Sequence, residues 1–251
     1  SLKKQLREMV LELARQEATQ EFAKDLVLEL ARQDTTQGLA KEMVVGLAEL
    51  IKPQDAKVLD RVKKALEINS DLRFIASPWS PPGWMKTTGS MLGGKMKPEF
   101  YAVYAGYLRK YLDAYAAEGV RVHYMTPQNE PNFPNAEYPT CYWSGEMQRD
   151  FVRDHLGPEL KQAGRDTQIW CWDHNWNKLD FPRAILTDPE AAQYVAGTAF
   201  HQYEGDVEAQ REWRAELPDK DIYFTEGSTF RTRAAMRIIE ILRNWARSYN
   251  A

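Results

Sequence analysis

The pattern of apolar and polar positions changes at about residue 52. Before it, apolar residues recur at helical spacing, and MVLELARQ (9–16) is echoed by LVLELARQ (26–33). A weaker third copy begins at Met43, and DTTQ (34–37) has the form of a helix capping box. The pattern predicts three short amphipathic helices that cover a hydrophobic surface. Self-association through residues 1–51 is the alternative role.

From residue 53 onward, short apolar runs alternate with amphipathic stretches. The runs predict strands at residues 72–76, 121–126, 168–172, 195–200 and 222–225. The stretches between them predict helices at residues 55–68, 98–117, 145–163, 188–194, 206–216 and 233–249. This alternation is typical of a parallel sheet. Because no glycine-rich phosphate loop joins a strand to a helix, a TIM-type barrel is favoured over an open doubly wound sheet.

Composition narrows the possible partners. The 251 residues include 33 Lys and Arg against 36 Asp and Glu, for a net charge of −3, and no basic cluster that would favour nucleic acid. No apolar run approaches the roughly 20 residues needed to span a bilayer, and charges occupy the N-terminus where a signal peptide needs apolar residues. Cys141 and Cys171 offer no disulfide framework, so localisation stays open.

Two segments have the same form, an apolar strand that runs directly into a glutamate. They are HYMTPQNEP (123–131), which contains Glu130, and IYFTEGS (222–228), which contains Glu226. A carboxylate at the end of a buried strand is costly unless it is paired or used. Two such glutamates on one face of a barrel, about 5 Å apart, have the arrangement of a retaining glycosidase.

Several motifs, in order along the chain, resemble those of glycoside hydrolase family 30, the glucosylceramidase-like family. They are ASPWSPPGWMKT (76–87), TPQNEP (126–131), WDHNW (172–176), FHQY (200–203) and TEGS (225–228). The resemblance covers residues 55–251 and implies a (β/α)8 barrel with the acid/base after the fourth strand and the nucleophile after the seventh. It therefore implies Glu130 as acid/base and Glu226 as nucleophile. It also implies β-glucoside, glucosylceramide-like or β-1,6-glucan substrates, and secretion.

Four further residues are predicted to contact substrate. The amide of Asn129 is placed to donate to a sugar hydroxyl next to Glu130. Trp79 resembles the family's sugar-platform tryptophan, although a ring packed on its own loop is the alternative. His201 and Tyr203 lie two apart on a strand, so they project to one side, either to bind substrate and orient Glu226 or as a structural pair.

Asp173, His174 and Trp176 follow the predicted strand at 168–172 and are expected to shape the pocket. Asp173 has the alternative of bracing His201 or an arginine. We expect no metal site, because the histidine spacings match no zinc or calcium pattern, and no cofactor.

The strand count departs from a complete barrel. If residues 72–76 form the third strand, the first two fall before residue 53 and the eighth follows Tyr249. The sequence therefore predicts a helical segment at 1–52 and a partial barrel at 53–251, with strands three to seven recognisable. The predicted function is retaining hydrolysis of β-glycosides. The alternative is a non-catalytic carbohydrate-binding protein or an engineered barrel fragment with weak or no activity.

Overall fold

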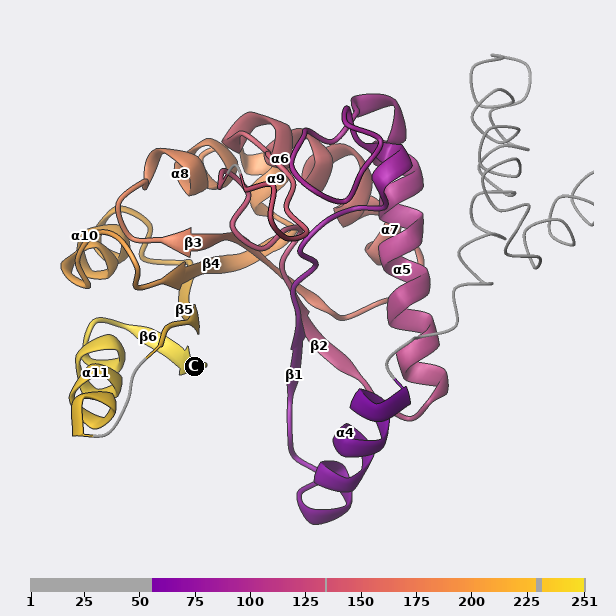
Figure 1. Cartoon of the computed structure of the whole chain (residues 1–251). Helices are drawn as coiled ribbons and strands as arrows, with labels where there is room; N and C mark the ends of the chain where they lie inside the picture. Colours follow the sequence, from indigo (N-terminus) through magenta and orange to yellow (C-terminus); the bar gives the residue numbers. More distant parts are fainter. Residues whose placement is uncertain (1–55, 134, 229–231, 251) are drawn as a thin grey trace, which may run out of the picture. The chain divides into compact units, whose positions relative to one another are not determined.

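The computed structural model describes residues 56–133, 135–228 and 232–250 (Figure 1). The helical repeat predicted for residues 1–52, and the self-association considered for it, lie outside these residues. Contacts divide the chain into two compact units, one comprising Ser1–Leu72 with Ala102–Arg121 and the other Arg73–Tyr101 with Val122–Ala251. No helix in the described parts is long and apolar enough to cross a membrane.

The described part of the first unit consists of two helices, α4 (Ala56–Ile68) and most of α5 (Tyr101–Ala117). Lys63 of α4 forms an exposed ion pair of 2.6 Å with Glu118, just beyond α5. The sequence placed both helices within a few residues of their observed bounds. The one predicted at 98–117 begins with a separate 3-10 turn at Pro98–Phe100, since proline has no N–H to donate and suits a first helical turn.

The second unit is built on one sheet whose six strands, among the described residues, are all parallel and follow chain order (Figure 1). The strands are β1 (Phe74–Ala76), β2 (Val122–Met125), β3 (Gln168–Asn175), β4 (Val195–His201), β5 (Asp221–Glu226) and β6 (Ala246–Tyr249). The sheet curls as part of a barrel does, which confirms the predicted fold class of a partial TIM-type barrel. Because all strands run the same way, their carboxyl ends lie at one edge.

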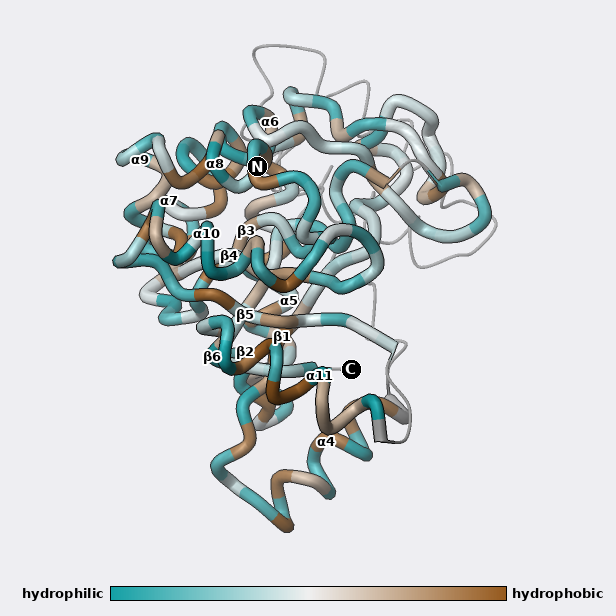
Figure 2. The backbone as a smooth tube through the Cα atoms, turned by 90° about the vertical axis from the view of Figure 1, so that its left-hand side faces the viewer, coloured by the Kyte–Doolittle hydropathy of each residue, from teal (hydrophilic) through white to brown (hydrophobic). Residues whose placement is uncertain are grey.

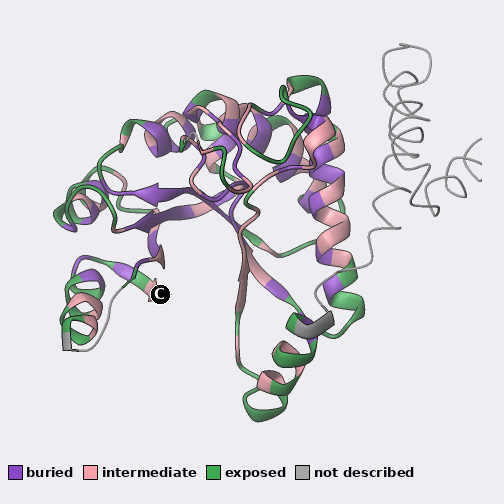
Figure 3. Ribbon diagram, viewed as in Figure 1, coloured by how far each residue is buried: buried purple, intermediate pink, exposed green. Residues whose placement is uncertain are grey.

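Helices of the second unit pack against the sheet. They are α6 (Gly145–Phe151), α7 (Gly157–Gln162), α8 (Asp180–Leu186), α9 (Pro189–Ala192), α10 (Glu208–Glu216) and α11 (Thr232–Arg243). Contacts join α8 to β3, α9 to β4, α10 to β5 and α11 to β6. Strands β3 and β4 are buried along almost their whole length (Figure 3). Short hydrophobic and hydrophilic stretches alternate along the backbone (Figure 2). Apolar strands covered in this way are expected of a parallel sheet.

A layer of stacked aromatic rings fills one face of the sheet. Trp170 of β3 stacks on Tyr223 of β5 with ring centroids 3.6 Å apart, and on Tyr124 of β2 at 4.4 Å. The intervening strand β4 contributes the small side chain of Ala199 to this cluster. Large rings from β2, β3 and β5 thus meet over the small side chain of β4, as side chains fill the interior of a barrel.

The end of the chain corrects the predicted helix at 233–249. Helix α11 ends at Arg243, and Ala246–Tyr249 form β6, which pairs with β5. The sequence analysis expected the strand after the one at 222–225 only beyond Tyr249. Trp245 has a left-handed φ of 75°, which stops the helix. The side chain of Gln210, on α10, donates to the carbonyls of Ile241 (3.2 Å) and Asn244 (2.8 Å). The apolar spacing alone predicts that the helix continues through Trp245, but these hydrogen bonds from another helix favour its end at Arg243.

Three smaller differences concern the middle of the chain. Strand β3 extends to Asn175 rather than residue 172, so Asp173 and His174 belong to the strand. The predicted helix at 145–163 is interrupted by a π-helical turn at Val152–Leu156, and α8 was not predicted. Helix α8 has only seven residues, too few for helical periodicity to stand out.

Candidate active site

Glu130 and Glu226 meet at the carboxyl edge of the sheet. Glu130 lies in the segment that follows β2, and Glu226 is the last residue of β5. A carboxylate oxygen of each, together with a ring nitrogen of His201, lie within 4.8 Å of one another. The structure therefore brings together the two glutamates that the sequence singled out, at close to the separation of the carboxyl groups in retaining glycosidases, about 5 Å.

The backbone of Glu130 is held in an unusual conformation. Its φ is +45°, a left-handed value that L-residues seldom adopt and that clusters at functional sites. The Glu130 N–H donates to the Asp173 carbonyl (3.0 Å) across the gap to β3. The side chain is 13% exposed, and its Oε1 lies 3.2 Å from His201 Nδ1 and 3.6 Å from His174 Nε2. Glu130 is thus fixed between two histidines.

The two histidines beside Glu130 differ in charge. Burial lowers the pKa of His174 to about 4 despite the neighbouring Glu130, so its ring is neutral at pH 7. Burial also disfavours the charged form of His201, but hydrogen bonds to Asp173 and Glu130, with the charge of Glu226, raise its pKa to about 9. While these carboxylates are ionised, His201 is an imidazolium at pH 7, with both ring N–H groups directed at carboxylates.

Glu226 has a tyrosine partner. The Tyr203 hydroxyl donates to Glu226 Oε1 at 2.9 Å, and the Tyr203 N–H is held by the Asn175 side chain at 2.9 Å. Burial, the hydrogen bond to Glu226 and the nearby carboxylates raise the pKa of Tyr203, so it stays a donor at neutral pH. The hydroxyl of Tyr203 thus holds one oxygen of Glu226 in place.

Exposed aromatic rings stand near the glutamates. Trp79 is 45% exposed and meets Tyr138 edge-on, with ring centroids 5.4 Å apart. Phe133, three residues after Glu130, is also exposed and packs edge-on to His174. Ring faces of this kind can bind the C–H face of a sugar. Phe133 and Tyr138 were not among the predicted residues, because nothing in their local sequence marks them.

Asn129 is mostly buried next to Glu130. Its N–H donates to the Pro78 carbonyl (2.9 Å), and the Gln128 side chain donates to the carbonyls of Trp79 and Asn129 (both 2.7 Å). These bonds join the loop that carries Trp79 to the segment that carries Glu130. The positions of the Trp79 ring and the Glu130 carboxylate are consequently coupled.

A buried lysine also organises the Trp79 loop. Lys86 is fully buried, and its Nζ donates to the Ser80 hydroxyl (2.9 Å) and to the carbonyls of Met91 (2.7 Å) and Thr140 (2.5 Å). Burial lowers its pKa. The ammonium thus ties the loop after β1 to the loop after β2.

Asp173 and Trp176 do not reach the surface of the site. Trp176 is 2% exposed, and its indole N–H donates to Gln210 of α10 (3.0 Å). Asp173 is 1% exposed, and its oxygens accept from His201 and three hydroxyls, those of Ser77, Thr126 and Thr225. The substrate role predicted for Asp173 and Trp176 stays a prediction, and Asp173 contacts His201, as its alternative role requires.

The hydroxyl residues around Asp173 were missed by the sequence analysis. Ser77 directly follows β1, Thr126 directly follows β2, and Thr225 is the penultimate residue of β5. A Ser or Thr at the same place on several parallel strands was the available signal, since those ends share one edge of the sheet.

The spacing of Glu130, His201 and Glu226 would also suit a cation, since one ligand atom from each lies within 4.8 Å of the others. A metal requires a free lone pair on the imidazole. Both nitrogens of His201 are directed at carboxylates, and its pKa of about 9 leaves the ring protonated at pH 7. A cation there would have to displace the proton from His201 Nδ1 and break its contact with Glu130.

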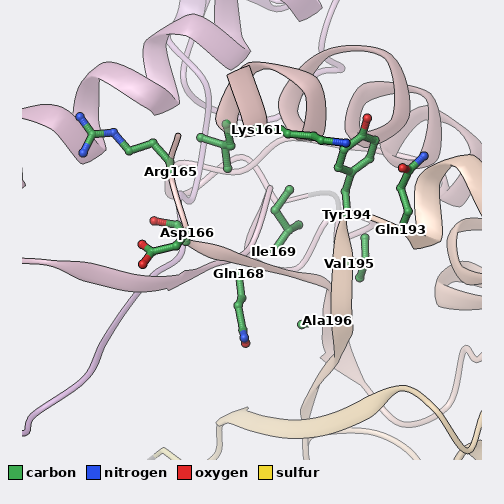
Figure 4. A pocket seen from close by; sticks show the side chains of 12 residues that line it. Lys161, Arg165, Asp166, Gln168, Ile169, Gln193, Tyr194, Val195 and Ala196 are labelled. Carbon is green, nitrogen blue, oxygen red and sulfur yellow. The ribbon is translucent and has the colours of Figure 1, made fainter. Parts of the chain in front are cut away.

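A hollow of about 410 Å³ lies at the opposite edge of the sheet (Figure 4). It is lined at the amino ends of β3 and β4 by Gln168, Ile169, Val195 and Ala196, with Tyr194 and Arg165 nearby. It shares no residue with the site at the carboxyl edge. In barrel enzymes the amino-terminal edge serves stability rather than chemistry.

A curled parallel α/β sheet with two carboxylates facing each other at its carboxyl edge defines the class of (β/α)-barrel glycoside hydrolases. Comparison with known families agrees, because the profile described as "Glycosyl hydrolase family 30 TIM-barrel domain" matches residues 48–248. The chain belongs to glycosyl hydrolase family 30, and the resemblance noted in its sequence is confirmed.

Individual relatives are known glycoside hydrolases by name. An endo-1,6-beta-D-glucanase of Trichoderma harzianum is 33% identical over 202 residues, covering 73% of this chain and 41% of the relative. The lysosomal acid glucosylceramidase of Mus musculus is 36% identical over 163 residues, covering 60% of this chain and 31% of the relative. The chain spans less than half the length of these relatives.

Solved structures agree with the fold. The structure of an endo-beta1,6-glucanase superimposes with a TM-score of 0.76 and 33% identity, covering 80% of this chain and 50% of that one. The protein SrfJ of Salmonella typhimurium superimposes with a TM-score of 0.71 and 30% identity, covering 78% of this chain and 47% of that one.

Proposed function

We propose that the site hydrolyses β-glycosidic bonds with retention of anomeric configuration, by double displacement. The observation that carries the proposal is the approach of a Glu130 oxygen and a Glu226 oxygen to within 4.8 Å. Inverting enzymes hold their carboxyl groups about 6.5–9.5 Å apart, to leave room for a water, whereas retaining enzymes hold them about 5 Å apart.

The surroundings of the two glutamates support distinct roles. Glu226, with one oxygen held by the Tyr203 hydroxyl, attacks the anomeric carbon and forms a glycosyl ester. Glu130 protonates the departing oxygen, and its carboxylate then takes a proton from the water that hydrolyses the ester. Its partner His201 has a ring nitrogen 3.2 Å away that can donate to the carboxylate or accept from the acid.

The substrate we propose is a β-linked glucoside, either a β-1,6-glucan or a glucosylceramide-like glycolipid. Support comes from the relatives named as endo-1,6-beta-glucanases and glucosylceramidases, and from the exposed ring of Trp79 beside Tyr138. Release of new reducing ends from β-1,6-glucan and of glucose from glucosylceramide, measured side by side, distinguishes the two.

The mechanism is tested with an aryl β-glucoside and the variants Glu226→Gln and Glu130→Gln. We expect Glu226→Gln to abolish turnover, and Glu130→Gln to retain part of it with a good leaving group, which needs little protonation. Proton NMR of the first product formed should show the β-anomer. A first product with the α-configuration would refute retention.

The alternative function, carbohydrate binding without catalysis, predicts a different result. A folded chain that binds β-1,6-glucan, turns over no glycoside, and binds equally well with both glutamates replaced would favour it. A binding site has no need of a closely spaced carboxylate pair, whose mutual repulsion is costly.

A further inference from the structure

Asp173 joins the carboxyl ends of five neighbouring strands. Its Oδ2 accepts from Ser77 Oγ (2.5 Å) and Thr126 Oγ1 (2.8 Å), which directly follow β1 and β2. Its Oδ1 accepts from His201 Nε2 (3.1 Å), at the end of β4, and from Thr225 Oγ1 (2.6 Å) in β5. The carboxylate itself belongs to β3 and is 1% exposed. Each oxygen of the Asp173 carboxylate thus accepts two hydrogen bonds from residues at the carboxyl ends of the neighbouring strands.

A β-bulge places Asp173 in this position. Trp172 pairs with Ala199 and His174 with Phe200, so Asp173 is an extra residue in β3. Trp172 and Asp173 both have left-handed φ values, 74° and 62°. Two consecutive non-glycine residues in this region persist only where the surrounding structure fixes them. The same bulge directs the Asp173 carbonyl to the Glu130 N–H (3.0 Å).

The contact between Asp173 and His201 determines which ring nitrogen faces Glu130. A carboxylate accepts only, so the Nε2 of His201 must carry a proton. When Glu130 is a carboxylate, Nδ1–H donates to it; when Glu130 is protonated, its O–H can donate to Nδ1 of the neutral ring. Both protonation states of Glu130 are accommodated without a rotation of the imidazole.

We propose that Asp173 is the positioning residue of the acid/base glutamate, because it fixes the orientation and the Nε2 proton of His201. This inference rests on the proposed function for what Glu130 does, but its structural part concerns His201 alone. The competing possibility is that Asp173 only ties strand ends together. That possibility predicts a loss of stability without any effect on the titration of His201.

The test follows His201 by NMR of the full chain labelled with ¹⁵N-histidine, which contains four histidines. The His201→Gln variant identifies the resonance by its absence. In Asp173→Asn, we expect the titration midpoint of His201 to fall by at least about one pH unit, because one of its two carboxylate partners becomes neutral. Thr126→Val removes a hydroxyl from the other oxygen, Oδ2, and should leave the midpoint unchanged.

Activity is measured in parallel on an aryl β-glucoside, with the exposed Asp219→Asn as matched control. We expect Asp173→Asn to lower kcat about 100-fold, the usual size of an acid/base contribution, with KM changed little and the pH profile displaced. Equal loss in Thr126→Val and Asp173→Asn, with an unmoved His201 midpoint, would overturn the proposal in favour of a purely structural role.

Two further outcomes separate this proposal from the proposed function. A chain that hydrolyses no glycoside, yet whose His201 midpoint depends on Asp173, supports the assignment of His201 and overturns the function. A chain that hydrolyses the glycoside, but whose His201 midpoint is the same in Asp173→Asn, supports the proposed function and overturns the role of Asp173. If Asp173→Asn does not fold, Thr225→Val should raise the His201 midpoint, because Oδ1 then accepts from the imidazole alone; a fall or no change overturns the proposal.

Discussion

Replacing Lys86 by Met tests whether one buried ammonium holds the Trp79 loop. Met has a similar length and no charge, so the change removes three hydrogen bonds while leaving the space filled. The acceptors are the Ser80 hydroxyl and the carbonyls of Met91 and Thr140. Ser80 already donates to the Pro81 carbonyl (2.8 Å) and loses little.

The magnitude follows mainly from the Thr140 carbonyl, because the Met91 carbonyl keeps the Thr140 N–H as a donor (3.1 Å). A buried acceptor without a partner costs about 1–3 kcal/mol. The buried ammonium has a desolvation cost of its own, which Met avoids and which offsets part of that loss. We expect Lys86→Met to lower the free energy of unfolding by about 1–2 kcal/mol.

The assay is urea denaturation followed by circular dichroism, with Lys161→Met on the exposed face of α7 as matched control. The control should remain within about 0.5 kcal/mol of the unmodified chain. Because Lys86 holds the loop but touches neither glutamate, the KM for an aryl β-glucoside should rise more than kcat falls. A Lys86→Met variant as stable as the control would refute the reasoning.

Other predictions concern protonation and packing. The pKa of His201 is raised to about 9 from an ordinary 6.5, so its protonation contributes about 3 kcal/mol to the free energy of unfolding. This contribution is complete below pH 6.5 and is lost as pH rises through 9. Chemical denaturation should therefore give a lower stability at pH 9.5 than at pH 6.5, and His201→Gln should abolish the difference. The pKa of His174 is lowered to about 4, so the unfolded chain takes up a proton at this residue before the folded chain does. Stability should therefore decline as pH falls from 6.5 toward 4, and His174→Gln should remove this decline. Gly197→Ala would place a Cβ 2.0 Å from the Asp221 carbonyl oxygen and should cost about 3 kcal/mol in a thermal melt, an expectation that an unchanged Tm contradicts. Gln210→Ala takes the side-chain partner from the Asn244 carbonyl and from the Trp176 indole N–H, whereas the Ile241 carbonyl keeps the Asn244 N–H (3.2 Å). We expect a loss of about 2–4 kcal/mol of stability and faster hydrogen exchange in β6; protection as in the unmodified chain would show that β6 forms without this cap.

The order of strands and the two glutamates were predictable, because apolar runs and a carboxylate at a strand end are local signals. Parallel strands place Glu130 and Glu226 at the same edge, and the curl of the sheet brings them together across β3 and β4. The burial of Asp173 was not predictable, since it depends on a bulge in β3 and on hydroxyls from three other strands. The prediction failed at α11 for the same reason: its end is fixed by a side chain far away in sequence.

That side chain gives the fold a built-in order of assembly. Gln210 connects the indole of Trp176, which follows β3, to the end of α11, so it joins three segments through one amide. Strand β6 can pair with β5 only if α11 ends at Arg243. The side-chain amide that donates to the carbonyls at this end, that of Gln210, belongs to α10. The last strand is therefore expected to dock late, on a scaffold that the preceding helix completes.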